Sequence, residues 1–323
     1  MSMWHLLTLM AVSAISEYGG LMTRSVLVTG CSSGLGKEVA LGFAAQGYQV
    51  IAGVRKAEDA YPLMSYGQSV TPVILDLRNR EQIAEAAKSV DQQCGADGLS
   101  ILVNMAGYTF VSPFEFTEEQ IARDLFDVLF FGPAALTKAL LPALKRNIAK
   151  RGSRPKVMNI ISWAAIDVSP FVGFYSSAKA AFLRLSEGQF YEFQSIGVDA
   201  IAVLPGLMKT PFVTIKTGSE IETTLARLPQ KGQAAYAASL SRMAGMGRSA
   251  QSSPMIPKPD SVAKRILKIA EIKSPRSRYL IGTDTHLVSL LNKLFPLCLL
   301  ETMKVNIFRI RRRGLYGIDS QAA

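Results

Sequence analysis

The chain has 323 residues, of which 49% are hydrophobic and 19% are charged, so it can bury a sizeable core and is not a disordered segment. Its formal net charge of +11 is typical of proteins with anionic partners, such as nucleic acid, a membrane surface or a phosphorylated cofactor. The only two histidines, His5 and His286, lie near the ends of the chain, which argues against a His-based triad and against a metal site.

Residues 1–22 predict an N-terminal extension that the fold can do without. The stretch WHLLTLMAVSAI is apolar and of signal-peptide length, but no Lys or Arg precedes it, and it is too short to span a bilayer. Met22 lies just ahead of the first clear strand. A mis-called start, a surface extension and a membrane-lying segment all remain open.

Strand-like apolar runs alternate with helix-length amphipathic segments over residues 23–285. The runs occupy residues 24–30, 48–54, 71–77, 100–107, 156–162, 197–206 and 277–282. Near-continuous apolar strands separated by helices predict an α/β fold with a doubly wound parallel sheet of the Rossmann type. No repeat or linker is evident before residue 206, so we expect a single domain.

A glycine-rich loop, TGCSSGLG at 29–36, lies between the first strand and the first helix. Gly30, Gly34 and Gly36 permit a tight turn and a close approach of the backbone to a pyrophosphate, whose charge a helix N-terminus favours. The loop therefore predicts a dinucleotide site, although its spacing is GxxxGxG rather than the commoner GxGxxG.

The end of the second strand predicts which dinucleotide binds. A cofactor with a free ribose 2′-hydroxyl usually meets Asp or Glu there, but this strand runs into AGVRK, with Arg55 in that place. A guanidinium can bind a 2′-phosphate bidentately, and Ser33 could add a hydroxyl donor. We therefore expect NADP(H) in preference to NAD(H); the alternative is that Arg55 merely faces solvent.

The stretch VGFYSSAK places Tyr175 four residues before Lys179, on one face of a helix. A Lys held there could stabilise a phenolate, whereas an unperturbed Tyr is a poor acid or base near neutral pH. A short motif of this kind also matches ordinary helix starts by chance, so it needs the rest of the chain for support.

From about residue 24 to residue 212 the ordered motifs resemble those of the short-chain dehydrogenases/reductases, and in particular the steroid 17β- and retinol dehydrogenases with extended lids. The loop TGCSSGLG, the elements LDL and NMAG, a serine thirteen residues before Tyr175, the YxxxK pair and PGLMKT occur in the family's order. The resemblance implies the catalytic residues Ser162, Tyr175 and Lys179. The cofactor-binding residues that it and the glycine loop imply are Gly30, Ser32, Ser33, Gly34, Leu35, Gly36, Arg55, Asp76, Leu77, Asn104, Ala106, Gly107, Tyr175, Lys179, Pro205, Gly206 and Thr210.

The resemblance also implies a reaction: NADP(H)-dependent interconversion of a hydrophobic alcohol, primary or secondary, and its aldehyde or ketone, of steroid, retinoid or lipid type. Tyr175 would be the general acid/base, and Lys179 would lower its pKa and bind the nicotinamide ribose. Ser162 would hydrogen-bond the substrate oxygen, Asp76 would contact the adenine, and Thr210 would lie near the nicotinamide amide.

The chain departs from the family at two positions. Met105 stands in place of the second Asn of NNAG, where an apolar residue can pack under the turn. Leu129 stands in place of an Asn that helps to hold a water in the proton relay, and it has no polar atom. Either bulk water or a backbone carbonyl replaces the relay, or the protein binds cofactor with weak or lost catalysis.

Two segments are expected to surround the substrate. Residues 207–259 follow a strand end and suit a lid, or equally a poorly ordered insertion. Residues 286–323 form a basic amphipathic tail, in which leucines flank Pro296 and Arg309 and Arg311–Arg313 follow. The tail is expected first to cover the substrate mouth or pack on another subunit, and second to make peripheral contact with anionic lipid.

Further expectations concern partners and compartment. The resemblance implies a homo-oligomer, a dimer or tetramer, paired through the helices bearing 118–147 and 176–195. No nucleic-acid motif is present. The three cysteines show no CxxC spacing and no even framework, which favours a reduced compartment, and we expect a cytoplasmic protein with possible peripheral membrane association.

Overall fold

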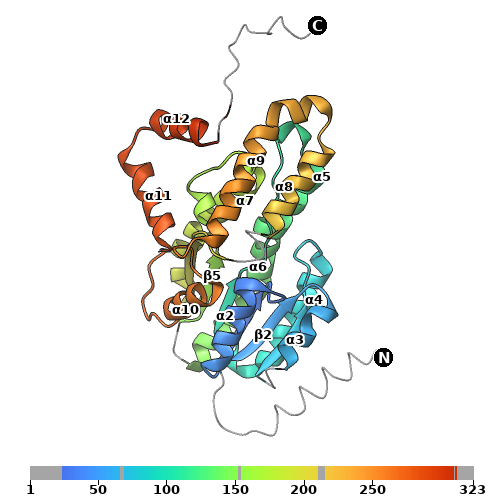
Figure 1. Ribbon diagram of the computed structural model, residues 1–323. Helices are drawn as coiled ribbons and strands as arrows, with labels where there is room; N and C mark the ends of the chain where they lie inside the picture. The colour runs from blue at the N-terminus through green and yellow to red at the C-terminus, as the bar shows by residue number, and fades with distance from the viewer. Residues whose placement is uncertain (1–23, 66–68, 152–153, 210–214, 309, 311–323) are drawn as a thin grey trace, which may run out of the picture.

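The computed structural model describes residues 24–65, 69–151, 154–209, 215–308 and 310 (Figure 1). Within them, seven parallel strands form one sheet in the order β3-β2-β1-β4-β5-β6-β7. Each lies in a run predicted as a strand or overlaps it, so the predicted fold is confirmed. The bounds are β1 Ser25–Thr29, β2 Gln49–Val54, β3 Val70–Ile74, β4 Ile101–Asn104, β5 Lys156–Ile160, β6 Asp199–Pro205 and β7 Arg278–Ile281.

Helices cover both faces of the sheet, because alternate strand residues point to opposite faces and nearly all of them are apolar. Val26 and Val28 belong to a buried cluster with α2 (Gly34–Ala45) and α10 (Pro259–Ala270). Leu27 belongs to a second cluster with α4 (Arg80–Cys94) and α6 (Gly132–Arg151). On that second face α7 (Gly173–Glu192) packs against β6. The short remaining elements are α3 Tyr61–Met64 and the turns Ala57–Ala60, Gly95–Asp97, Phe114–Phe116, Trp163–Ala165 and Phe193–Ile196.

One long helical segment, Glu119–Ala149, is long and apolar enough to cross a membrane by length and composition alone. It consists of α5 (Glu119–Phe126), a π-helical turn (Asp127–Phe131) and most of α6. Leu136, Leu140 and Leu144 on α6 are fully buried against the sheet. The apolar character of α6 therefore serves the core of the domain.

The described part of the lid is helical rather than irregular. α8 (Ile215–Arg227) and α9 (Gln230–Ser252) contact each other and stand well away from α2 and α4 (Figure 1). Their apolar residues share a cluster with Val111 and Phe171 of the body of the domain. The lid is thus anchored by a small core of its own.

The tail forms α11 (Thr283–Leu294) and α12 (Leu297–Ile307), which run along one side of the molecule (Figure 1). Asn292 donates a hydrogen bond to the carbonyl of Ile166 at 3.2 Å, and Lys304 forms an ion pair with Asp167. Both partners lie in the loop between β5 and α7. The described part of the tail therefore holds in place the loop that precedes Tyr175.

Candidate active site

The glycine loop lies at the carboxyl end of β1, next to β4, where the strand order changes direction and ligands of such sheets bind. A Cβ on Gly36 would lie 2.1 Å from the carbonyl oxygen of Gly30, and Gly30 itself has φ +76°. Ser32 and Ser33 are exposed ahead of α2, while Leu35 packs against the core. The backbone turns too tightly here for side chains, which fits a pyrophosphate cradle at the helix N-terminus.

A threonine that the motif analysis gave no role of its own joins this loop to NMAG. The Thr29 hydroxyl accepts hydrogen bonds from the backbone amides of Met105 and Ala106, both at 2.9 Å. The Asn104 amide donates to Thr137 at 3.0 Å and to Asn159 at 2.9 Å. These bonds fix the end of β4 beside the glycine loop. In the sequence Thr29 was only the first residue of the loop motif TGCSSGLG, and nothing there paired it with NMAG.

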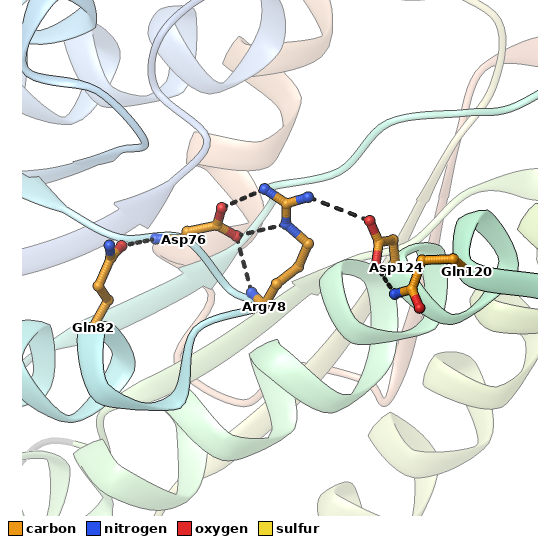
Figure 2. Close-up of polar contacts among 5 residues, drawn as sticks. All are labelled: Asp76, Arg78, Gln82, Gln120 and Asp124. Atoms are coloured by element: carbon orange, nitrogen blue, oxygen red, sulfur yellow. Dashed lines mark hydrogen bonds and ion pairs between the residues drawn. The ribbon is translucent and has the colours of Figure 1, made fainter.

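The adenosine end of the expected cofactor site carries Arg55, Asp76 and Leu77. Arg55 is exposed just after β2, Leu77 is buried, and Asp76 follows β3. Hydrogen bonds from Arg78 lower the pKa of Asp76, and the charge of Arg55 acts in the same direction. Figure 2 shows the guanidinium of Arg78 between Asp76 and Asp124. A shallow cavity of about 570 Å³ opens here, lined by Asp76, Arg78, Asn79, Arg80, Glu81 and Asp124.

The structure brings together the three residues expected to be catalytic. Ser162 follows β5 and lies near enough to the phenol of Tyr175 on α7 to act on its pKa, and its hydroxyl accepts a hydrogen bond from the amide of Ala164 at 3.2 Å. One turn further along α7, the ammonium of Lys179 donates to the carbonyl of Ile160 at 3.1 Å. Lys179 is only 5% exposed, so its side chain is buried and is not solvated.

Burial dominates the electrostatics of the pair. It raises the pKa of Tyr175, against the opposing effect of Ser162, and it lowers the pKa of Lys179 to about 8. The expected lowering of the phenol pKa by Lys179 is therefore absent from this structure. Desolvation disfavours the charged form of each group, and Lys179 does not contribute to the pKa shift of Tyr175. Near neutral pH the phenol is protonated.

Leu129 lies in the region of Lys179, the lysine expected to be catalytic. It is 1% exposed and belongs to a cluster with Leu125 and Ala178, against which Tyr175 packs. A Cβ placed on Gly107 would lie 2.7 Å from a methyl of Leu129 and 3.9 Å from the Lys179 nitrogen. Leu129 thus presents hydrocarbon to the region where the family carries a relay amide.

A carboxylate in the tail fixes the turn that follows β6, and sequence reasoning missed it. Asp284 accepts a hydrogen bond from the amide of Leu207 at 2.6 Å. A Cβ on Gly206 would lie 2.1 Å from the same carboxylate, and Pro205 ends the buried strand. Thr210 lies outside the described residues. Asp284 lies 77 positions after Leu207 in the sequence, so no local pattern pairs it with this turn.

A larger, mostly apolar cavity of about 620 Å³ lies between the loop 168–174 and α12. Phe171 and Phe174 line it, and Phe114 stacks on Phe174 with 5.6 Å between ring centroids. On the side of α12 it is lined by Glu301, Lys304, Val305 and Ile310. An apolar space next to the residue preceding Tyr175 suits a hydrophobic ligand.

Comparisons with known proteins agree with this geometry. The family model described as short chain dehydrogenase matches residues 24–222. The NADPH-dependent 3-dehydrocapnine reductase of Ornithobacterium rhinotracheale is 32% identical over 58% of this chain, a region that spans just under two thirds (66%) of the relative. Retinol dehydrogenase 5 of Mus musculus is 28% identical over 84% of each chain. The crystal structure of a short-chain dehydrogenase from Streptomyces avermitilis is 28% identical, with a TM-score of 0.66 over 88% of this chain and 97% of that one.

Proposed function

Because the chain belongs to the short-chain dehydrogenase family, we propose that it is an NADP(H)-dependent oxidoreductase that interconverts a hydrophobic alcohol and its ketone or aldehyde. The observation that carries the proposal is the grouping of Ser162 and Tyr175 one helical turn from Lys179, which is buried and donates a hydrogen bond to the carbonyl of Ile160. A phenol, a hydroxyl and an ammonium converge at the carboxyl end of the sheet, beside the glycine cradle. This combination supplies a proton donor, an oxygen-binding group and a charge next to a dinucleotide site.

The residues present fit the dinucleotide. The turn at Gly30 and Gly36 has no room for a Cβ atom at either residue. Backbone without side chains can approach a pyrophosphate closely at the helix N-terminus. Arg55 is exposed at the end of β2, free of any competing carboxylate on that strand, and favours a 2′-phosphate over a bare hydroxyl. The reductase from Ornithobacterium rhinotracheale is named as NADPH-dependent, which agrees with this choice.

The bound nicotinamide would supply the hydride, and the side chains would handle the substrate oxygen. Tyr175 carries its proton at neutral pH, as an unperturbed Tyr also does, and would donate it to a carbonyl oxygen; burial raises its pKa and so makes it a weaker acid in this structure. Ser162 would hydrogen-bond the same oxygen as negative charge develops on it. Lys179 would bind the nicotinamide ribose. A preference for NADP(H) favours carbonyl reduction over alcohol oxidation.

A second candidate function follows from Leu129. One of its methyl groups and the Lys179 nitrogen lie on the same side of Gly107, and a leucine side chain has no polar atom to hold a relay water. A protein of this kind could bind NADPH with weak or lost catalysis. Turnover of any hydrophobic ketone at a normal rate would exclude this candidate, whereas NADPH binding without turnover across a broad screen would favour it.

We also propose where the protein acts. Leu287, Leu290 and Leu294 are exposed at helical spacing on α11, and Leu299, Met303 and Ile307 are exposed on α12. Arg309 and Arg311–Arg313 follow in the sequence. Apolar stripes followed by arginines suit peripheral contact between a cytoplasmic enzyme and anionic lipid.

Vesicle flotation tests this contact. The protein should float with phosphatidylserine vesicles, and the bound fraction should fall at high salt, because screening weakens attraction through arginines. Chemical crosslinking in the same samples separates lipid contact from the expected dimer or tetramer. If the bound fraction depends on neither the lipid charge nor the salt concentration, the proposed role of the arginines is wrong.

The activity is tested by following NADPH absorbance with a panel of steroid, retinoid and long-chain carbonyl compounds. Tyr175→Phe should lower turnover by about 10²–10⁴-fold, the usual range for general acid–base help, and leave NADPH binding intact. Tyr191→Phe is the matched control, because it makes the same chemical change on α7 at an exposed residue that does not line the apolar cavity. Wild-type turnover in Tyr175→Phe would exclude the proposed chemistry.

A further inference from the structure

Arg78 is the centre of a polar cluster at the adenosine end of the proposed cofactor site (Figure 2). Its Nε donates to Oδ1 of Asp76 at 3.1 Å and its Nη2 to Oδ2 of Asp76 at 2.6 Å. Its Nη1 donates to Asp124 of α5 at 3.3 Å, and Gln120 donates to the other oxygen of Asp124 at 2.8 Å. One guanidinium therefore fixes a loop after β3 and a helix that begins more than forty residues later.

The bonds use the two oxygens of Asp76 unequally. Oδ1 accepts from both the side chain and the backbone amide of Arg78, the latter at 3.0 Å, so its two lone pairs are engaged. Oδ2 accepts only from Nη2 among the described residues. The backbone amide of Asp76 is itself engaged by Gln82 at 2.9 Å. One lone pair of Oδ2 remains to accept an N–H from a ligand, and the fork of Arg78 fixes its direction.

We propose that Arg78 is a positioning residue for adenine: it holds Asp76 so that Oδ2 accepts a hydrogen bond from the exocyclic amino group of the base. The inference rests on the proposed function, because it needs a dinucleotide in the site. Hypoxanthine carries a carbonyl where adenine carries the exocyclic amino group. Its carbonyl oxygen is an acceptor and would face the Asp76 carboxylate, so Oδ2 would have no donor to pair with. The chain should therefore discriminate between adenine and hypoxanthine cofactors through Arg78.

The test compares the binding of NADPH with that of its deaminated analogue, nicotinamide hypoxanthine dinucleotide phosphate, by cofactor fluorescence. The wild-type protein should prefer NADPH by about tenfold or more, as expected for a hydrogen bond to a charged group. Arg78→Gln and Arg78→Lys should both reduce the preference to about twofold. Lys keeps the charge but cannot form the fork, so rescue by Lys would overturn the proposed geometry.

Two further variants serve as controls. Arg123→Gln removes an exposed arginine of α5 that bonds only Glu119, and it should leave the preference unchanged. Arg55→Gln should weaken NADPH relative to NADH and leave the adenine preference intact. A purely structural role for Arg78 would weaken both base analogues equally, and that result would overturn the inference.

The outcomes also separate this inference from the proposed function. If the wild-type protein binds neither NADPH nor NADH, the proposed function fails. If it binds NADPH and the hypoxanthine analogue equally, the assignment of Arg78 and Asp76 fails while the oxidoreductase proposal stands.

Discussion

Replacing Leu129 by Asn would restore the amide that the family carries beside the catalytic lysine. Leu129 is 1% exposed, so the loss of its side chain from the core costs about 2–5 kcal/mol. A buried amide with unmet hydrogen bonds adds about 1–3 kcal/mol. One methyl of Leu129 and the Lys179 nitrogen would lie 2.7 Å and 3.9 Å from the same Cβ on Gly107, so a bond from the ammonium to the new oxygen can return part of this cost. We expect Leu129→Asn to be clearly less stable but to keep or raise the rate.

The matched control is Leu125→Asn. Leu125 is fully buried in the same cluster, but no measured contact places it beside Lys179. It should lose as much stability as Leu129→Asn and gain nothing in rate. Thermal unfolding and steady-state kinetics at 15 °C, with circular dichroism to establish the folded fraction, measure both effects. The cooler assay keeps a destabilised variant folded.

Two results with the leucine variants would contradict this expectation. If Leu129→Asn is folded and binds NADPH but its kcat collapses, the hydrocarbon itself is needed behind Lys179, and an amide relay is not what this site lacks. If both leucine variants lose rate in proportion to stability, the position acts through packing alone.

Three other predictions concern the cofactor. Asp284→Ala should cost about 1.5–3 kcal/mol of stability, the usual worth of a hydrogen bond to a charged group, and raise the KM for NADPH, because the amide of Leu207 loses its acceptor; an unchanged KM would contradict this. NADPH affinity should fall as pH rises through about 8, because Lys179 is charged below that pH and neutral above it; fluorescence titrations from pH 6.5 to 9.5 would show a flat profile if Lys179 does not bind cofactor. Gly36→Ala should abolish NADPH binding, since its Cβ would meet a backbone carbonyl at 2.1 Å, whereas Gly245→Ala, with nothing within 4 Å, should bind normally.

The fold and the core of the site could be predicted because their signals are local. Apolar runs such as residues 24–30 encode buried strands directly, and the spacing of Tyr175 and Lys179 encodes a shared helix face. Cys31 of the glycine loop is fully buried, as a small residue in so tight a turn can be. The family resemblance, confirmed by the family model over residues 24–222, ordered these local signals into one site.

The residues that were missed act through long-range contacts. Asp284 and Arg78 are ordinary charged residues in the sequence, and only the folded chain brings them to Leu207 and Asp124. The lid was harder still, because glycines and scattered polar residues obscure the period of α9. Its alanines and methionines favour a helix, but the packing that stabilises it comes from residues of the domain body.

The shared cluster of lid and body has a consequence for how fast products leave. Val111 is fully buried beneath Ile221 and Leu240, and Phe171 of the loop before α7 packs against the same group. Swinging the two lid helices clear would expose all of this hydrocarbon to water. If α8 and α9 form the predicted lid, its large openings would therefore be infrequent, and we expect bulky molecules to exchange slowly.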